Sequence, residues 1–155
     1  EIDIATLDIP ILRSATEFAG PVPETLQPAF EKIKAADHIV LVFPLWLGTL
    51  PALTKAFFEQ VAHRNVAFED SKDGGWPKGA LSGRSARIVV TMGMPALIYR
   101  FWFLAHGLRG FERNVLALIG IKPIRETLFG MIEGVSPERR QGWIRRMEKL
   151  GTAAS

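Results

Sequence analysis

Along this chain of 155 residues, short runs with the apolar pattern of strands alternate with segments whose apolar residues recur at helical spacing. Unbroken apolar runs at residues 39–43 and 88–90 are typical of parallel strands that helices cover on both faces. The alternation in EIDIATL, residues 1–7, predicts an opening strand, and ETLFGMI belongs to a last strand that begins near residue 124. Four strands are therefore expected.

The segments between these strands carry apolar residues at helical spacing. Helices are predicted over residues 24–37, residues 51–61, a region that extends to about residue 117, and residues 137–150. The connections at residues 8–26 and 68–86 are predicted loops. Strands that alternate with helices form βαβ units, so the sequence predicts the α/β class with a doubly wound parallel sheet.

Local signals predict where two of these helices begin. Thr49 is expected to cap the second helix, with Pro51 in its first turn. Ser136 is expected to cap the closing helix, with Pro137 at its first position. The predicted inward faces are Phe30 and Ile33 in the first helix, Leu53, Ala56, Phe57 and Val61 in the second, and Trp143, Met147 and Leu150 in the last.

Composition narrows the function classes. A hydrophobic content of 48% over 155 residues suffices for one domain with a core. Without Cys there are no disulfides or zinc-thiolate sites, the histidines show no metal-ligand spacing, and we expect a cytoplasmic protein. The net charge of +3 is spread along the chain, which argues against nucleic acid. Residues 39–53 are interrupted by Pro and Gly, so no membrane span is expected.

An apolar loop, Pro44 to Thr49, follows the strand that ends at Phe43. Ligands of open α/β sheets bind beyond the carboxyl ends of the strands, where this loop and residues 91–95 are expected. The amides of residues 45–48 would suit a flat aromatic ligand, with Trp46 beside its face. Alternatively, the apolar side chains pack under a neighbouring loop or against a second subunit.

The segment VFPLWLGTLPALTKAFFEQV, residues 42–61, resembles a segment of the flavodoxin-like NAD(P)H:quinone oxidoreductase family. The resemblance continues through PKGALSGRSARIVVTMG, ETLFGMI and RRQGWIRRMEKLG, and so covers nearly the whole chain. It implies a noncovalently bound flavin, FMN or FAD. It also implies hydride transfer from NADH or NADPH through that flavin to a quinone or a similar acceptor.

The resemblance also implies which residues hold the flavin. The residues that would line its isoalloxazine ring are Pro44, Leu45, Trp46 and Leu47. Those that would approach its other edge are Thr91, Met92, Gly93 and Met94, although the family has a glycine where Met94 stands. No residue is expected to bind a metal.

Tyr99 stands where the family places a tyrosine that stabilises charge on the reduced flavin, and His106 lies near the position of its histidine partner. Imidazole can supply or share a proton near neutral pH. If the stretch is helical, their separation is about two turns, so both would face one site. The alternatives are a Tyr99 hydroxyl in water at the edge of the core and a His106 that is a satisfied polar group at a subunit contact.

One part of the family pattern has no counterpart in this chain. The family's first strand ends in a loop that holds the flavin phosphate against a helix N-terminus, whereas the opening EIDIATL resembles the second strand. We therefore expect residues 1–155 to form a single flavodoxin-like domain that is incomplete at its N-terminus. Weak flavin binding is the expected consequence.

Two other functions remain open. The first is a regulatory or interaction subunit on the same fold, since some relatives accompany potassium efflux systems. The second is a flavodoxin electron carrier, which ranks last because such carriers are usually acidic.

A homodimer is also expected, because family members commonly place the active site between two subunits. The run YRFWFLAHGL supports this, since Phe101, Trp102 and Phe103 cannot all face one core stripe of a helix. The alternative is a helix sandwiched inside the monomer.

Overall fold

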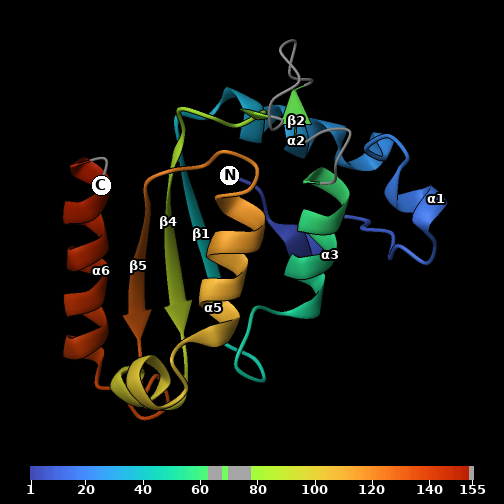
Figure 1. Cartoon of the computed structure of the whole chain (residues 1–155). Helices are drawn as coiled ribbons and strands as arrows, with labels where there is room; N and C mark the ends of the chain where they lie inside the picture. The colour runs from blue at the N-terminus through green and yellow to red at the C-terminus, as the bar shows by residue number, and fades with distance from the viewer. Residues whose placement is uncertain (63–67, 70–77, 154–155) are drawn as a thin grey trace.

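A parallel sheet of three strands forms the centre of the molecule (Figure 1). The computed structural model describes residues 1–62, 68–69 and 78–153. Strands β1 (His38–Pro44), β4 (Ser85–Thr91) and β5 (Ile124–Phe129) lie in the order β1-β4-β5, each parallel to its neighbour. The α/β class and the three later strands are therefore confirmed.

The register of the sheet separates its two faces. Phe43 pairs with Val90, and Val90 pairs with Leu128, so these three side chains point to one face. Helices α3 (Ala52–Val61) and α5 (His106–Phe111) cover that face. The opposite face is covered by α6 (Pro137–Thr152), which runs along β5 in Figure 1.

Aromatic contacts join the sheet to its helices. Phe111 of α5 meets Phe43 of β1 and Phe58 of α3 edge to face, with ring centroids 6.2 and 4.9 Å apart. On the other face, Phe129 of β5 stacks on Trp143 of α6 at 4.9 Å. Edge-to-face and offset geometries are the favourable ones for aromatic pairs, so each contact adds to the free energy gained by burial.

The first predicted helix is present as a 3₁₀ turn, η2 (Glu24–Leu26), that continues into α2 (Gln27–Ala35). Leu26 and Ile33 are buried, whereas Phe30 is half-buried. The closing helix α6 begins as predicted, because the Ser136 hydroxyl accepts a hydrogen bond from the Arg139 amide. Its inward stripe is half-buried rather than fully buried.

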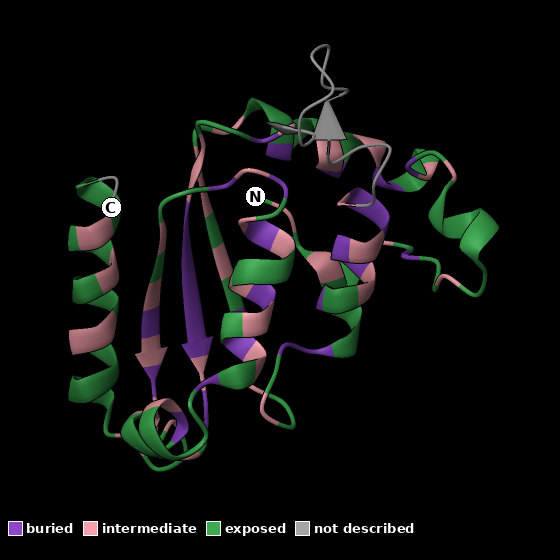
Figure 2. Ribbon diagram, viewed as in Figure 1, coloured by how far each residue is buried: buried purple, intermediate pink, exposed green. Residues whose placement is uncertain are grey.

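Strand β4 is buried on both faces, as predicted, but β1 is not (Figure 2). Val40 and Val42 are 51% and 68% exposed. They point to the same face as Phe129 of β5, whose ring stacks on Trp143 of α6, but α6 runs along β5 and not along β1 (Figure 1). Among the described residues, β1 also has a strand partner on one side only.

Two predictions near the N-terminus were wrong. The opening segment is a 3₁₀ turn, η1 (Ile4–Thr6), because the Asp3 side chain caps the Ala5 amide in place of a neighbouring strand. Residues 8–26 are mostly loop but include a short helix, α1 (Ala15–Phe18). Strands β2 (Phe68–Glu69) and β3 (Lys78–Gly79) form a small antiparallel ladder, and the rest of the predicted loop between them lies outside the described residues.

The second predicted helix begins later than expected. α3 starts at Ala52, and Thr49 does not cap it because its amide and carbonyl group both pair with Trp46. Phe57 and Val61 are buried as predicted, but Leu53 is 43% exposed.

The long helical region before residue 117 is interrupted. It consists of a π-helical turn η3 (Ile98–Trp102), the helix α5 and a second π-helical turn η4 (Glu112–Leu116). Leu104 and Ala105 stand between η3 and α5 with φ of 52° and 49°. None of the helices in the described residues is both long enough and apolar enough to cross a bilayer.

Phe111→Ala is expected to lower the free energy of unfolding by about 3 kcal/mol or more, because it removes the ring that joins α5 to β1 and α3. Urea unfolding monitored by circular dichroism measures the change. Ile11→Ala is the control, since Ile11 is 69% exposed, and its effect is expected to stay within about 0.5 kcal/mol. Equal effects of the two substitutions would contradict the aromatic core.

Candidate functional site

The apolar loop after β1 is a tight two-residue turn. The Trp46 amide donates to the Thr49 carbonyl at 2.9 Å, and the Thr49 amide donates back to the Trp46 carbonyl at 3.0 Å. Leu47 and Gly48 at the tip have φ of 49° and 80°, the left-handed pair of a type I′ turn. We call residues 46–49 the apolar turn. Leu47 at its tip is fully exposed, and Trp46 is 62% exposed.

A second loop, residues 91–94, lies beside the apolar turn at the carboxyl ends of the strands. The Leu45 amide donates to the Thr91 carbonyl at 2.8 Å, which ties the two loops together. The Met92 amide donates to the Phe129 carbonyl at 2.9 Å, so the loop is also tied to the end of β5. Met92 is buried, whereas Gly93 is exposed.

Backbone amides of these loops remain available to a ligand. Within the described part of the chain, the amides of Leu47, Gly48, Gly93 and Met94 have no acceptor. The amides of Leu45 and Trp46 are already bonded, so only half of the amides predicted at residues 45–48 are available. Four free donors beside an exposed indole fit a flat ring that carries carbonyl oxygens and ring nitrogens.

Packing under a neighbouring loop does not explain the apolar turn. Leu45 is half-buried and packs against the core, but the side chains of Trp46 and Leu47 stand in solvent. The remaining alternatives are that a ligand or a second subunit covers the side chains of Trp46 and Leu47.

Tyr99 is 1% exposed, and its hydroxyl lies inside the protein. It donates to the Gly48 carbonyl at 3.0 Å and accepts from the Leu108 amide at 3.2 Å. Burial raises the pKa of Tyr99. The alternative of a Tyr99 hydroxyl in water is therefore wrong.

His106 is exposed and is the first residue of α5. Tyr99 and His106 were expected to lie two turns apart on one helix. This prediction is wrong, because Leu104 and Ala105, with positive φ, break the helix between them. The fold nevertheless brings the two residues to one place, since the Tyr99 hydroxyl bonds to the amide of Leu108, two residues beyond His106.

The segment around η3 exposes several apolar side chains. It lies near the apolar turn, because Tyr99 of η3 is bonded to Gly48 of that turn. We call it the η3 surface, and its members are Leu97, Ile98, Phe101, Trp102, Phe103 and Leu104. Trp102 is 81% exposed, which is unusual for so large an apolar side chain. This segment is therefore not sandwiched inside the described part of the chain.

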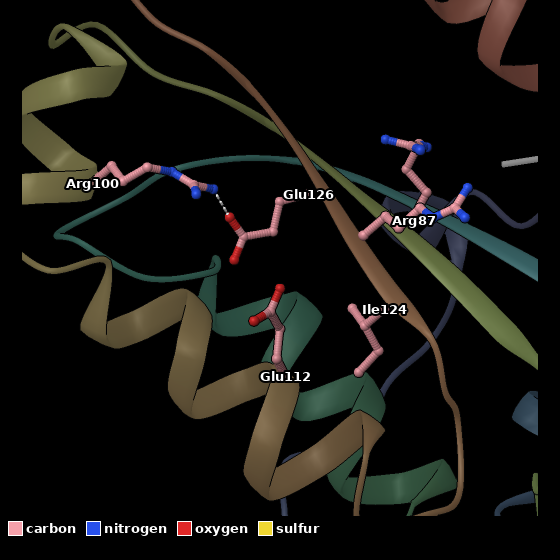
Figure 3. A pocket seen from close by; sticks show the side chains of 6 residues that line it. Arg87, Arg100, Glu112, Ile124 and Glu126 are labelled. Carbon is pink, nitrogen blue, oxygen red and sulfur yellow. Dashed lines mark hydrogen bonds and ion pairs between the residues drawn. The ribbon is translucent and has the colours of Figure 1, made fainter.

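A polar cavity of about 450 Å³, wide open to solvent, lies at the edge of β5. Figure 3 shows Glu126 of β5 and Glu112 of η4 directed toward each other, with Arg100 of η3 paired to Glu126. Burial, and then the neighbouring Glu126, raise the pKa of Glu112 to about 7, while Arg100 and Arg109 oppose that rise. The residues that line the cavity are Arg87, Arg100, Glu112, Ile124, Arg125 and Glu126.

This carboxyl pair was not among the residues predicted from the sequence. Glu126 gave a weak signal, because it stands between Ile124 and Leu128 on the strand face that packs under α5. No cluster of three or more His, Asp or Glu side chains in the described ranges could hold a metal ion.

Comparison with known proteins agrees with the resemblance seen in the sequence. The sequence pattern of the family described as "Flavodoxin-like fold" matches residues 1–150. The FMN-dependent NADH:quinone oxidoreductase 1 of Hahella chejuensis is 33% identical over 95 residues, which are 61% of this chain and 43% of that protein. An uncharacterized NAD(P)H oxidoreductase of Haemophilus influenzae is 28% identical over 126 residues, 81% of this chain and 61% of that protein.

Solved structures agree on the fold. Smu.1420 from Streptococcus mutans superposes with a TM-score of 0.77 at 22% identity, and the match covers 94% of this chain and 77% of that one. At this identity the likeness concerns the fold alone. The chain spans about half the length of the sequence relatives that it matches.

The Glu112 carboxyl predicts how stability depends on pH. Its pKa of about 7 in the folded protein lies above the ordinary 4.5, so folding retains a proton that the unfolded chain releases. The free energy of unfolding should therefore fall as pH rises from about 4.5 to about 7. Glu112→Gln should reduce that fall by on the order of 1 kcal/mol, since Glu112 is only half-buried.

Urea unfolding at pH 5 and pH 8 measures the difference between the two proteins. Glu133→Gln is the control, because Glu133 is an exposed carboxylate outside the cavity. If Glu112→Gln follows the same pH dependence as the unmodified chain, the raised pKa of Glu112 does not contribute to stability.

Proposed function

The chain belongs to the flavodoxin-like fold family, and from this premise we propose that the protein is a flavin-dependent oxidoreductase. It would transfer hydride from NADH or NADPH, through bound FMN or FAD, to a quinone or a similar acceptor in the cytoplasm. FMN and NADH are favoured because they appear in the name of the Hahella chejuensis relative. The observation that carries the proposal is the set of four free amides beside the exposed Trp46.

The two loops at the carboxyl ends of the strands would hold the flavin ring. Amides of the apolar turn and of residues 93–94 would donate to its carbonyl oxygens and nitrogens, and Trp46 would pack beside it. The residues proposed to surround the ring remain Pro44, Leu45, Trp46, Leu47, Thr91, Met92, Gly93 and Met94. When bound, the flavin would supply a group that accepts a hydride and passes it on.

His106 would supply or share a proton at the rim of this site. Its ring is exposed, and the next residue, Gly107, packs directly on the backbone of Gly48 and Thr49. Tyr99 belongs to the same site through its bond to Gly48. This arrangement supports a role for His106 as the source of an exchangeable proton near the amides that would hold the ring.

We also propose that two copies of the protein pair through the η3 surface. Phe101, Trp102 and Phe103 are 69%, 81% and 50% exposed, and exposed apolar surfaces of this kind mark interaction sites. Tyr99 of the same helical turn is bonded to Gly48 of the apolar turn, so a second subunit seated on the η3 surface would lie near the flavin. The active site would then lie between two subunits.

Flavin titration tests the proposed activity. FMN fluorescence should be quenched on binding, and anaerobic NADH should then bleach the bound flavin. Trp46→Ala is expected to weaken FMN binding roughly 3- to 10-fold, because the indole face is lost. Ile144→Ala is the control, since Ile144 is equally apolar, 50% exposed and located on α6.

Absence of binding and of bleaching, even at FMN and FAD concentrations high enough to reveal weak binding, would contradict the oxidoreductase proposal. A protein partner recovered under those conditions would favour the regulatory subunit.

Sedimentation velocity tests the pairing. The unmodified chain should sediment as a dimer, and Trp102→Glu should shift it to the monomer, because a buried charge without a partner is strongly unfavourable. Ile11→Glu places the same charge at a residue that is 69% exposed but far along the chain from the η3 surface, and should leave the dimer intact. A monomeric wild-type chain would contradict the proposal.

A further inference from the structure

We infer that Tyr99 is a positioning residue whose hydroxyl clamps the apolar turn to the start of α5. The clamp would set the place of the free amides at Leu47 and Gly48. The effect of the clamp on flavin binding rests on the proposed function. The clamp itself does not, because its hydrogen bonds are present in the chain without flavin.

The hydrogen bonds of Tyr99 leave little capacity for a ligand. A phenolic hydroxyl has one proton to donate, and Tyr99 gives it to the Gly48 carbonyl at 3.0 Å. The Leu108 amide donates to the same oxygen at 3.2 Å. Since the side chain is also 1% exposed, Tyr99 can donate to a ligand only after its bond to Gly48 breaks.

Gly107 gives independent evidence that the two segments are in direct contact. A Cβ at this position would overlap the Gly48 carbonyl oxygen and would lie 2.7 Å from the Cβ and 2.9 Å from the Cα of Thr49. Backbone atoms cannot move aside as a flexible side chain would. Only glycine therefore allows α5 to approach the apolar turn this closely.

Backbone conformation explains why the turn needs a clamp. Leu47 has φ of 49°, and Leu104 and Ala105 have φ of 52° and 49° in a second tight turn, closed by the His106 amide and the Phe103 carbonyl. A residue other than glycine is strained in this region, because its Cβ crowds the neighbouring backbone. Such conformations persist only where the surroundings hold them, and Tyr99 is bonded to both turns: its hydroxyl to Gly48 and its carbonyl to the Ala105 amide.

A clamp and a proton donor at Tyr99 make different predictions for the bound flavin. A clamp arranges the amides before any ligand arrives, so its loss weakens oxidised and reduced FMN equally. A donor to the reduced ring favours only the reduced form, so its loss lowers the midpoint potential. The potential therefore distinguishes the two roles.

Tyr99→Phe is the main test, because it keeps the buried ring and removes only the hydroxyl. Without flavin, hydrogen exchange at the Leu108 amide should become faster than in the unmodified chain. With FMN, the dissociation constant should rise about 10-fold while the midpoint potential stays unchanged. Unchanged exchange at Leu108, or a lowered potential with unchanged binding of oxidised FMN, would overturn the inference.

Gly107→Ala and Gly110→Ala form a matched pair. Both put the same methyl group into α5, but Gly110 has no atom within 4 Å of the new position, whereas Gly107 meets the apolar turn. Gly107→Ala should weaken FMN binding and Gly110→Ala should not, with circular dichroism to verify folding. Equal binding by both variants would overturn the positioning role.

The exchange measurement separates this inference from the proposed function. If the unmodified chain does not bind FMN, the proposed function fails, while hydrogen exchange at Leu108 still decides whether the clamp exists.

Discussion

Parallel pairing of β4 with β1 on one side and β5 on the other is the constraint on which the site depends. It places Pro44 opposite Thr91 and Thr91 opposite Phe129, so all three strands end at one level. Loops that leave such an edge have no further strand to pair with and meet one another instead. The bond between the Leu45 amide and the Thr91 carbonyl is the direct result.

The apolar turn combines exposure with backbone strain, and neither stabilises the isolated chain. Leu47 is fully exposed in a left-handed conformation, and Trp46 presents most of its indole to solvent. The clamp formed by Tyr99 and the close approach of Gly107 hold the turn in this form. Strained, solvent-facing residues held by buried ones are typical of a site prepared for a ligand.

At the edge of β5, charged side chains stand on the face of the sheet that is otherwise apolar. Glu126 lies on an inward-facing position of an edge strand, where a charge discourages pairing with another chain. Arg100 neutralises it, and Glu112 then remains beside it as the group with the raised pKa. Arg100, Glu112 and Glu126 therefore bring η3, η4 and β5 together around the cavity.

The sequence by itself determined the class, the three main strands, the capped start of α6 and the apolar loop after β1, because these follow from local spacing and local capping. Tertiary structure alone decided the exposure of Val40 and Val42, since that depends on which strands α6 covers. It also decided the partners of the Tyr99 hydroxyl and the pairing of Glu112 with Glu126. These contacts join residues that are 9 to 51 positions apart in the chain, and no local pattern records a contact between segments that only folding brings together.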